Sequence, residues 1–116
     1  MKPEIFNEMI ATRRQIHKHP EEGWTEFETT YLVHERLKSL GYKKILKGTQ
    51  VIKPDAVLGR DPKLVQKAIA RAIEQGVPKS FIEEIDEYTG CVAVLETGRP
   101  GPVVALRFDM DALRIE

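Results

Sequence analysis

The sequence predicts an α/β fold in which several helices come first and a β-hairpin follows. Apolar residues recur three and four apart through much of the chain before Tyr88, as they do on the buried face of a helix. Two short apolar runs, Cys91–Leu95 and Val103–Phe108, then flank a turn rich in glycine and proline, which is typical of a hairpin. With 116 residues, 41% of them hydrophobic, the chain has enough apolar mass for one small domain with a core.

Two helices are expected in the first part of the chain, over residues 4–17 and 25–40. The apolar face of the first consists of Ile5, Phe6, Met9, Ile10 and Ile16. A loop over residues 17–23 follows, because Pro20 disfavours helical geometry at the residue before it. Gly41 ends the second helix as a left-handed cap. The stripe of the second helix consists of Phe27, Tyr31, His34 and Leu37.

The middle of the chain predicts a weak strand and two further helices. Residues 42–52 are a weak strand region, and residues 53–61 are a loop. A helix starts at Asp61-Pro62, where an N-cap acid precedes a proline at the first helical position, and Gly76 closes it. Its apolar stripe consists of Leu64, Val65, Ala68, Ile69, Ala72 and Ile73. A short helix over residues 78–87 is expected to turn Phe81, Ile82 and Ile85 inward.

Two carboxylates, Asp109 and Asp111, follow the second apolar run. Side chains alternate along an extended chain, so Arg107, Asp109 and Asp111 are expected to share one face. The carboxyl end of a buried strand is where open α/β sheets bind ligands, which suggests metal ligands or an acid pair that orients a ligand. Alternatively, Arg107 neutralises the acids in a surface or interface ion pair. A purely structural role is expected if Arg107 pairs with both acids and no cleft lies nearby.

Three further side chains, His17, His19 and Trp24, each allow a functional and a structural interpretation, and two more, His34 and Cys91, are expected to be structural. His17 and His19 lie near the end of the first predicted helix, where histidine serves as metal ligand, proton carrier or favourable charge at a helix C-terminus. Trp24 is suited to stack on an aromatic ligand or to anchor the packing of its loop. His34 is expected to be a hydrogen-bonded core or boundary residue. Cys91 is expected to be a small buried hydrophobic residue.

Composition argues against several functional classes. Lys plus Arg and Asp plus Glu number 18 each, so no basic excess marks a nucleic-acid or membrane-surface binder. We expect no signal sequence, because the first residues carry acids and lack a long enough apolar run, and no stretch approaches the roughly 20 apolar residues of a membrane span. One cysteine excludes an internal disulfide, so we expect a cytoplasmic location. The motifs of serine hydrolases, nucleotide-binding loops and zinc fingers are absent.

Three blocks of sequence together resemble one family. They are Arg13–Thr29 (RRQIHKHPEEGWTEFET), Leu40–Tyr42 (LGY) and Thr97–Leu113 (TGRPGPVVALRFDMDAL). The resemblance is to the metal-dependent amidohydrolases and aminoacylase-type peptidases, which include auxin-conjugate hydrolases and aminobenzoyl-glutamate hydrolase. The middle of the chain, with AIEQG at Ala72–Gly76 and then Thr89-Gly90 before the first apolar run, resembles the aminobenzoyl-glutamate hydrolase A-type branch.

This resemblance implies a hydrolase that cleaves an amide bond to an amino acid. The expected small-molecule substrate is p-aminobenzoyl-glutamate, a compound of folate catabolism, which would yield p-aminobenzoate and glutamate. Family members use two divalent metal ions, zinc or manganese, that activate water and polarise the amide carbonyl while a glutamate acts as general base. Their fold is an α/β catalytic domain, with a zinc-peptidase-like mixed sheet, interrupted by a smaller dimerisation domain.

The resemblance places Asp109 and Asp111 in the family's acid motif, as candidate catalytic residues. In many peptidase relatives the position of Asp109 is a metal-binding histidine and that of Asp111 is the acid that orients it. In the amidohydrolase branch a Cys-Gly-His segment takes over metal ligation, and Cys91, followed by Val92, does not replace it. No complete metal site is therefore expected, and no tightly bound metal. His17 and Trp24 are candidate substrate-binding residues.

The expectation is therefore that residues 1–116 form the N-terminal part of a catalytic α/β domain. The rest of that domain and the dimerisation domain would lie outside this sequence. Alone, the chain is expected to be inactive and to form a homo-oligomer, by strand pairing or exchange of elements, because its sheet edge and apolar surface lack cover. A related second subunit is a possible partner. The alternative is a non-catalytic binding or regulatory module that retains the front end of the fold.

Overall fold

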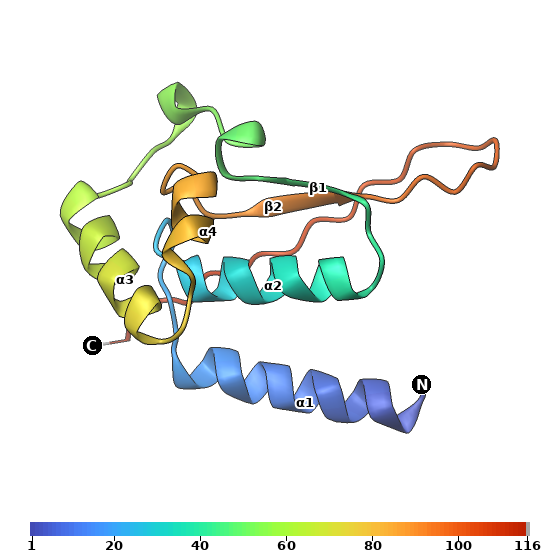
Figure 1. The fold of residues 1–116 in the computed structure, drawn as a ribbon, viewed down its shortest axis with the longest axis horizontal. Coiled ribbons are helices and arrows are strands. Elements are labelled where there is room, and N and C mark those ends of the chain that lie inside the picture. Colours follow the sequence, from blue (N-terminus) through green and yellow to red (C-terminus); the bar gives the residue numbers. More distant parts are fainter. Residues whose placement is uncertain (116) are drawn as a thin grey trace.

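The computed structural model describes residues 1–115 and contains helices and a two-stranded antiparallel sheet (Figure 1). This confirms the predicted α/β class. No helix of the described residues is both long enough and apolar enough to cross a membrane. The elements in chain order are α1 (Pro3–Lys18), α2 (Phe27–Ser39), β1 (Lys44–Lys47), the 3-10 helices Gly48–Gln50 and Pro54–Ala56, α3 (Pro62–Glu74), α4 (Lys79–Glu84) and β2 (Cys91–Val94).

The core lies where α3 and α4 pack against the N-terminal end of α2 (Figure 1). Phe27 of α2 is fully buried, and Tyr31 one turn later meets the Phe81 ring edge-on at a centroid distance of 5.0 Å. The buried core side chains are Phe27, Val65, Ala68, Ile69, Ala72, Val77, Phe81, Ile82 and Ile85. These include most of the stripes predicted for α3 and the short helix, because helical spacing places them on one face.

The start of α3 also agrees with the prediction. The Asp61 carboxylate accepts a hydrogen bond from the backbone N–H of Lys63 at 2.9 Å, and Pro62 occupies the first helical position. The two ends of the predicted stripe, Leu64 and Ile73, are 46% and 39% exposed, so only the central part of the stripe faces the core.

The predicted hairpin between Cys91–Leu95 and Val103–Phe108 is wrong. β2 pairs with β1, with Ile45 opposite Ala93 and Leu46 opposite Val92. Residues 103–108 form no strand, and the chain before them runs through a long loop that projects from the body (Figure 1). The turn therefore does not fold the second apolar run back onto β2.

Three hydrogen bonds explain why β2 lies beside β1. The backbone N–H of Gly90 donates to Thr30 Oγ1 of α2 at 3.1 Å, and the carbonyl of Gly90 accepts from the backbone N–H of Gly48 at 3.2 Å. The Thr89 hydroxyl donates to Glu26 Oε2 at 2.7 Å. These contacts join segments far apart in sequence, and local turn chemistry does not encode them.

The end of β1 approaches the end of α4 closely at Gly48. Its φ is +57°, and a β-carbon placed there would lie 2.3 Å from the carbonyl oxygen of Ile85. Next to it, Lys47 forms a 2.6 Å ion pair with Glu84, and this hydrogen bond and charge lower the pKa of Glu84. Lys47 Nζ also lies 3.5 Å from Nε2 of His34, which is buried as predicted.

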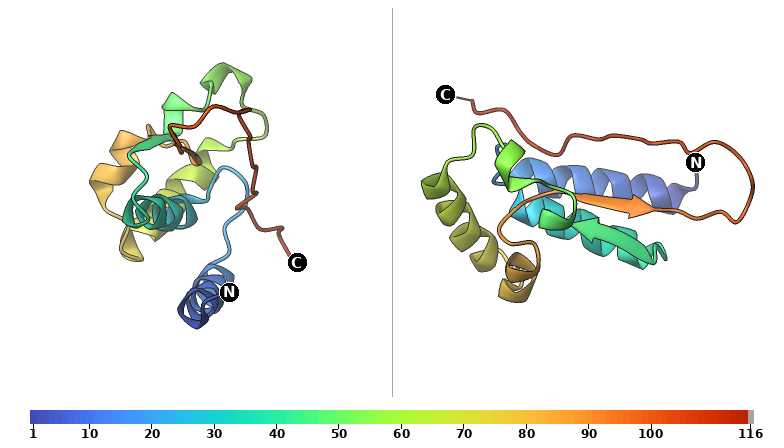
Figure 2. Two further views of the ribbon diagram at one scale, coloured as in Figure 1. Left: turned by 90° about the vertical axis from the view of Figure 1, so that its right-hand side faces the viewer. Right: turned by 90° about the horizontal axis from the view of Figure 1, so that it is seen from above.

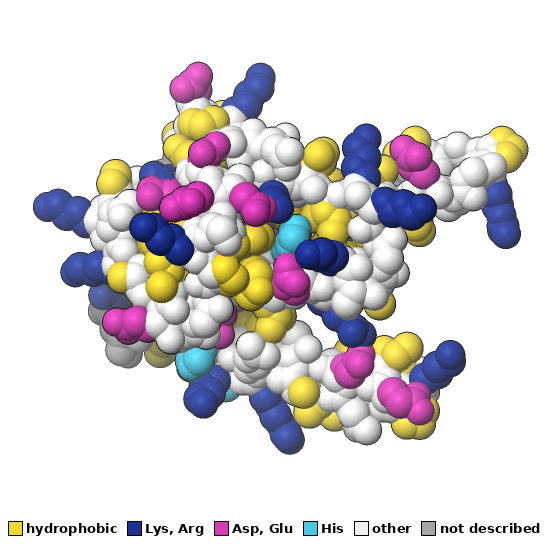
Figure 3. All heavy atoms as spheres, viewed as in Figure 1, with side chains coloured by type: hydrophobic (Ala, Val, Ile, Leu, Met, Phe, Trp, Pro, Cys, Tyr) yellow, Lys and Arg dark blue, Asp and Glu magenta, His cyan; other side chains and the backbone are white. Residues whose placement is uncertain are grey.

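The first helix stands apart from the core. α1 has no buried residue, and its predicted apolar face remains open, with Phe6 and Met9 each 54% exposed. An ion pair between Glu8 and Arg36 links it to α2. Figure 2 shows α1 separated from the other helices, and Figure 3 shows the hollow between α1 at the bottom and the body above it.

Candidate functional site

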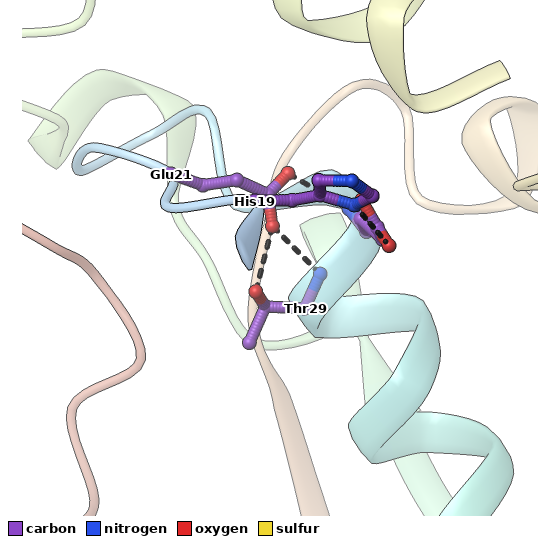
Figure 4. Close-up of polar contacts among 4 residues, drawn as sticks. His19, Glu21 and Thr29 are labelled. Atoms are coloured by element: carbon purple, nitrogen blue, oxygen red, sulfur yellow. Dashed lines mark hydrogen bonds and ion pairs between the residues drawn. The ribbon is translucent and has the colours of Figure 1, made fainter. Parts of the chain in front are cut away.

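The loop between α1 and α2 is built around Glu21. This carboxylate is 2% exposed and accepts hydrogen bonds from the backbone N–H groups of Glu28 and Thr29, at 2.9 and 2.8 Å (Figure 4). The Thr29 hydroxyl donates to the same carboxylate at 2.6 Å. Glu21 thus caps the first turn of α2 from outside that helix, which begins at Phe27, where otherwise unpaired N–H groups and the helix dipole favour a negative charge.

The two histidines of this region have different surroundings. His19 is half-buried, and its Nδ1 lies 3.0 and 3.1 Å from the two carboxylate oxygens of Glu28 (Figure 4). His17, on the last turn of α1, is exposed. The structure therefore gives His19 a partner that fixes the loop and does not bring His17 and His19 to a shared ligand.

Trp24 anchors the same loop to a distant segment. Its backbone is left-handed, with φ of +68°, which is uncommon for a residue with a side chain. The indole Nε1–H donates to the carbonyl oxygen of Leu58 at 2.8 Å, and the ring is half-buried. These contacts correspond to the packing role, which was one of the two roles predicted for Trp24.

The C-terminal acid Asp111 lies next to this loop. The backbone N–H of Ala112 donates to the carbonyl oxygen of Glu21 at 2.7 Å, which ties residues 110–112 to the loop. A β-carbon placed on Gly23 would lie 3.8 Å from Asp111 Oδ2, so the carboxylate approaches the loop backbone. Asp111 itself is exposed to solvent.

Asp109 has different surroundings from Asp111. Its Oδ1 lies 3.1 Å from Nη2 and 3.2 Å from Nε of Arg107, and the Arg107 and Asp109 side chains are 89% and 71% exposed. The expectation that a buried strand presents both acids together is wrong, because residues 103–111 form no strand in the structure. The alternative of an Arg107 ion pair holds for Asp109 and does not extend to Asp111.

Glu26 is a further acid of this site, and it was not among the residues predicted from sequence. Burial raises the pKa of Glu26, while the hydrogen bond from Thr89 lowers it and the nearby charges of Asp111 and Glu21 raise it. A carboxyl group with a raised pKa is suited to hold or pass a proton. No sequence signal marks Glu26, because Thr89 lies 63 residues away.

A groove of about 660 Å³ runs between α1 and residues 110–112. Its lining includes Met9, Ile16 and His17 of α1, and Met110, Asp111 and Ala112. Arg13 and Arg36 also line it, so apolar walls, guanidinium groups and carboxylates meet in a single open groove. The carboxylates of the lining are Glu8, Glu21 and Asp111, and Glu8 is paired with Arg36, so Arg13 is the guanidinium group of this lining for which the structure gives no ion pair. Apolar walls with a few polar groups are typical of a ligand site.

The described residues do not assemble a metal centre. Among residues 1–115, no three His, Cys, Asp or Glu side chains gather as possible ligands of one ion. Asp109 is engaged by Arg107, and His19 by Glu28. The carboxylates and histidines of this part of the chain therefore do not fit the two-metal site that the resemblance implies.

No family model matches the chain, but comparison with known proteins finds several similar sequences. A homolog of the A-type subunit of p-aminobenzoyl-glutamate hydrolase, from Haemophilus influenzae, is 39% identical over 110 residues, which cover 95% of this chain and 26% of that protein. The A-type subunit of the Escherichia coli hydrolase is 45% identical over 103 residues, which cover 87% of this chain and 23% of that protein. The chain is homologous to the A-type subunit of p-aminobenzoyl-glutamate hydrolase and to its amidohydrolase relatives.

Two further comparisons agree with this assignment. The indole-3-acetyl-aspartic acid hydrolase of Enterobacter agglomerans is 41% identical over 112 residues, covering 95% of this chain and 26% of that enzyme. The crystal structure of an aminobenzoyl-glutamate utilization protein from Klebsiella pneumoniae superposes with a TM-score of 0.85 at 42% identity, over 93% of this chain and 28% of that one. The chain thus spans about a quarter of the length of its amidohydrolase relatives. The family resemblance seen in the sequence is confirmed.

Proposed function

We propose that the chain is part of the catalytic domain of a hydrolase that cleaves p-aminobenzoyl-glutamate to p-aminobenzoate and glutamate. The observation that carries this proposal is the identity of 39% and 45% to two A-type chains of that hydrolase over most of the sequence. The related indole-3-acetyl-aspartic acid hydrolase is named for another aromatic acyl group joined to an acidic amino acid. An amide of this chemical class is therefore the proposed substrate.

Of the two candidate acids, we propose that Asp111 serves the site and that Asp109 does not. Asp111 lies beside the backbone of Gly23 and close enough to Glu26 to raise the pKa of that residue. It also lines the groove, whereas Asp109 is paired with Arg107 in solvent. We assign no catalytic role to His17, which lines the groove, or to Trp24, which holds the loop.

The metal dependence of the parent hydrolase is part of the proposal, with zinc and manganese as candidates. Two ions of this kind would supply an activated water and polarise the amide carbonyl. A tightly held ion needs about four or more protein or water donors in a fixed geometry, and the described residues gather no three candidate ligands. We therefore propose that the 116-residue chain alone does not turn over substrate.

Direct assay of the chain tests this point. The purified chain, loaded with zinc or manganese and incubated with p-aminobenzoyl-glutamate, is expected to release no glutamate above a protein-free control. Glutamate release that scales with chain concentration would refute the proposal that the chain alone is inactive.

A chimera tests the assignment to the hydrolase and the choice of acid. This chain replaces the matching residues of the Escherichia coli A-type protein, and the chimera is produced with whatever companion chain that protein requires. We expect glutamate release from p-aminobenzoyl-glutamate, a loss of at least about 100-fold in kcat/KM for Asp111→Asn, and a change of less than about threefold for Asp109→Asn. Equal loss in both variants would contradict the proposed division between the acids.

A second candidate function is a non-catalytic binding module. The groove beside Asp111, with its apolar and guanidinium lining, supports it. Titration calorimetry of the chain with p-aminobenzoyl-glutamate tests it, because saturable binding without glutamate release is the expected signature of a module. Activity of the chimera decides in favour of the hydrolase.

A further inference from the structure

Residues 58–60, the bridging segment, contact two segments that lie far apart in sequence. The bridging segment belongs to the loop that leads into α3 (Figure 1). At one end, the carbonyl oxygen of Leu58 accepts a hydrogen bond from the indole Nε1–H of Trp24 at 2.8 Å. At the other end, Nη2 of Arg60 donates to the carbonyl oxygen of Glu87 at 3.1 Å. The bridging segment thus joins the loop after α1 to the turn after α4.

The first end of the bridging segment leads to Asp111. Trp24 directly follows Gly23, and a β-carbon placed on Gly23 would lie 3.8 Å from Asp111 Oδ2. In the same loop, the carbonyl oxygen of Glu21 accepts the backbone N–H of Ala112 at 2.7 Å. The position of Asp111 therefore depends on the loop that Trp24 anchors.

The second end leads to Glu26. The guanidinium of Arg60 lies over the ring of Tyr88, 4.4 Å from the ring centre, which is an attractive cation–π contact. The next residue, Thr89, is buried, and its hydroxyl donates to Glu26 Oε2 at 2.7 Å. Arg60 therefore holds the residue that precedes the hydrogen-bond partner of Glu26. Asp111 is near enough to Glu26 for its charge to raise the pKa of Glu26, so the two ends meet at one site.

Backbone strain gathers at both ends of the bridging segment. Among residues 1–115, the non-glycine residues with a left-handed backbone are Trp24, Asp86 and Glu87, with φ of +68°, +50° and +63°. Trp24 and Glu87 each form a hydrogen bond with the bridging segment, and Asp86 adjoins Glu87. Such a backbone is unfavourable for a residue with a side chain, persists only where surrounding contacts impose it, and clusters at functional sites. The bridging segment supplies contacts of this kind at both places.

We propose that Trp24 and Arg60 are positioning residues for the hydrolase reaction. Through the bridging segment they fix Asp111 relative to Glu26, and neither of them touches the substrate. This role rests on the proposed function, because it requires that Asp111 serves the site. A segment that links two parts in series loses its effect when either end is released, which distinguishes it from two independent contacts.

Hydrogen exchange of the Trp24 indole tests the link in the chain itself. Trp24 is the single tryptophan of the chain, so its Nε1–H gives one indole resonance in a proton–nitrogen correlation spectrum. Arg60→Met should speed the exchange of this proton, although Arg60 binds Glu87 and Tyr88. The backbone amide of Ile69 in the core is the reference for global unfolding, and the indole rate should rise at least about tenfold more than the rate of that amide.

The matched control is Arg71→Met, which makes the same change of side chain at an exposed residue of α3. It should leave the exchange of the Trp24 indole unchanged. An indole proton that exchanges no faster in Arg60→Met than in Arg71→Met would overturn the proposal, whatever the activity of the parent hydrolase.

Kinetics of the chimera with the Escherichia coli A-type protein test the positioning role. Trp24→Phe removes the indole N–H and keeps an aromatic ring. This variant and Arg60→Met should each lower kcat about tenfold and change KM less than about twofold, whereas Arg71→Met should change neither. The double variant should also lose about tenfold in kcat, because each single variant already releases the bridging segment. A loss of about a hundredfold in the double variant would indicate two independent contacts and contradict the proposal.

The outcomes separate the positioning role from the proposed function. An unsubstituted chimera without activity would refute the proposed function and the positioning role that rests on it, while the exchange measurement still decides whether the bridging segment links its two ends. In an active chimera, a kcat that stays within about twofold in both single variants would overturn the positioning role alone.

Discussion

At the scale of single residues, one buried carboxylate holds the loop that carries the candidate site. Glu21 receives three hydrogen bonds from the start of α2, and its own carbonyl accepts the N–H of Ala112. The side chain therefore fixes the helix, while the backbone of the same residue fixes the segment that bears Asp111. Removing the side chain should affect both stability and the placement of that segment.

Replacing Glu21 by alanine leaves two backbone N–H groups and the Thr29 hydroxyl without their acceptor in a buried place. We expect a loss of about 2 kcal/mol in the free energy of unfolding, measured by urea denaturation followed by circular dichroism. Glu22→Ala is the matched control, because that side chain is exposed in the same loop, and its cost should stay within about 0.5 kcal/mol. Equal effects of the two variants would contradict the role given to Glu21.

Glu26 should make the stability of the folded chain depend on pH. Its pKa in the folded chain lies above the ordinary value of 4.5, because burial disfavours the charged carboxylate. Its contribution to stability is therefore fully present below pH 4.5 and is lost as the pH rises through the folded pKa. Glu26→Gln, which keeps an acceptor for Thr89, should gain stability relative to the natural chain as the pH is raised from about 4 to about 7. Urea midpoints measured at each pH test this, and a difference that is constant with pH would contradict it.

The residue-level predictions from sequence succeeded where a side chain acts on its own helix. Asp61 could be assigned as an N-cap because it bonds two residues away, and His34 because its position on the stripe implies burial. Glu21 and Glu26 could not be found in this way. Their partners lie in another element or 63 residues distant, so their roles depend on the tertiary structure.

At the scale of elements, non-local contacts decided the pairing of strands. The sequence predicts strand character at Cys91–Leu95 correctly, because an apolar run between turn residues is a local pattern. Its partner, β1, is set by the contacts of Gly48 and Thr30 with Gly90, which depend on how α3 and α4 pack. The position of α1 could not be predicted from sequence either. An amphipathic pattern shows which face of a helix is apolar, but it does not show what covers that face.

The junction of β1 with α4 requires a glycine at residue 48. Gly48→Ala should cost about 3 kcal/mol in unfolding free energy, because the new β-carbon meets the Ile85 carbonyl and the backbone is left-handed. Gly59→Ala measures the cost of the left-handed backbone without the steric contact. Gly59 has φ of +74° but no atom within 4 Å of the added carbon, so this substitution should cost about 1 kcal/mol. Thermal and urea unfolding measure both, and similar costs would contradict the steric argument.

At the scale of the whole molecule, the chain is less compact than its length allows. The Cα radius of gyration is 15.3 Å, against about 13 Å for a compact domain of this length. The groove beneath α1, the projecting loop before Val103 and the extended C-terminal segment account for the difference (Figures 1 and 2). The core formed by α2, α3 and α4 lies at one side of this open body.

Because the C-terminal segment buries little, the core should fold without it. A chain ending at Leu95 is expected to keep a cooperative urea transition and to lose no more than about 2 kcal/mol in unfolding free energy. Ala112→Pro in the full chain removes the N–H that binds Glu21, and it also fixes the backbone at residue 112, so its cost is an upper bound on the contribution of that hydrogen bond. Loss of the cooperative transition on truncation would show that residues 96–116 are needed for the core.

The thiol of Cys91 lies at the start of β2, where its reactivity can be measured with alkylating reagents. Cys91 is half-buried, and burial raises the pKa of its thiol, so the reactive thiolate is scarce at neutral pH. Alkylating reagents should consequently modify the folded chain more slowly than the unfolded chain, because the thiolate is scarcer in the folded state. The chain thereby carries a chemical reporter of its own folded state at the first residue of β2.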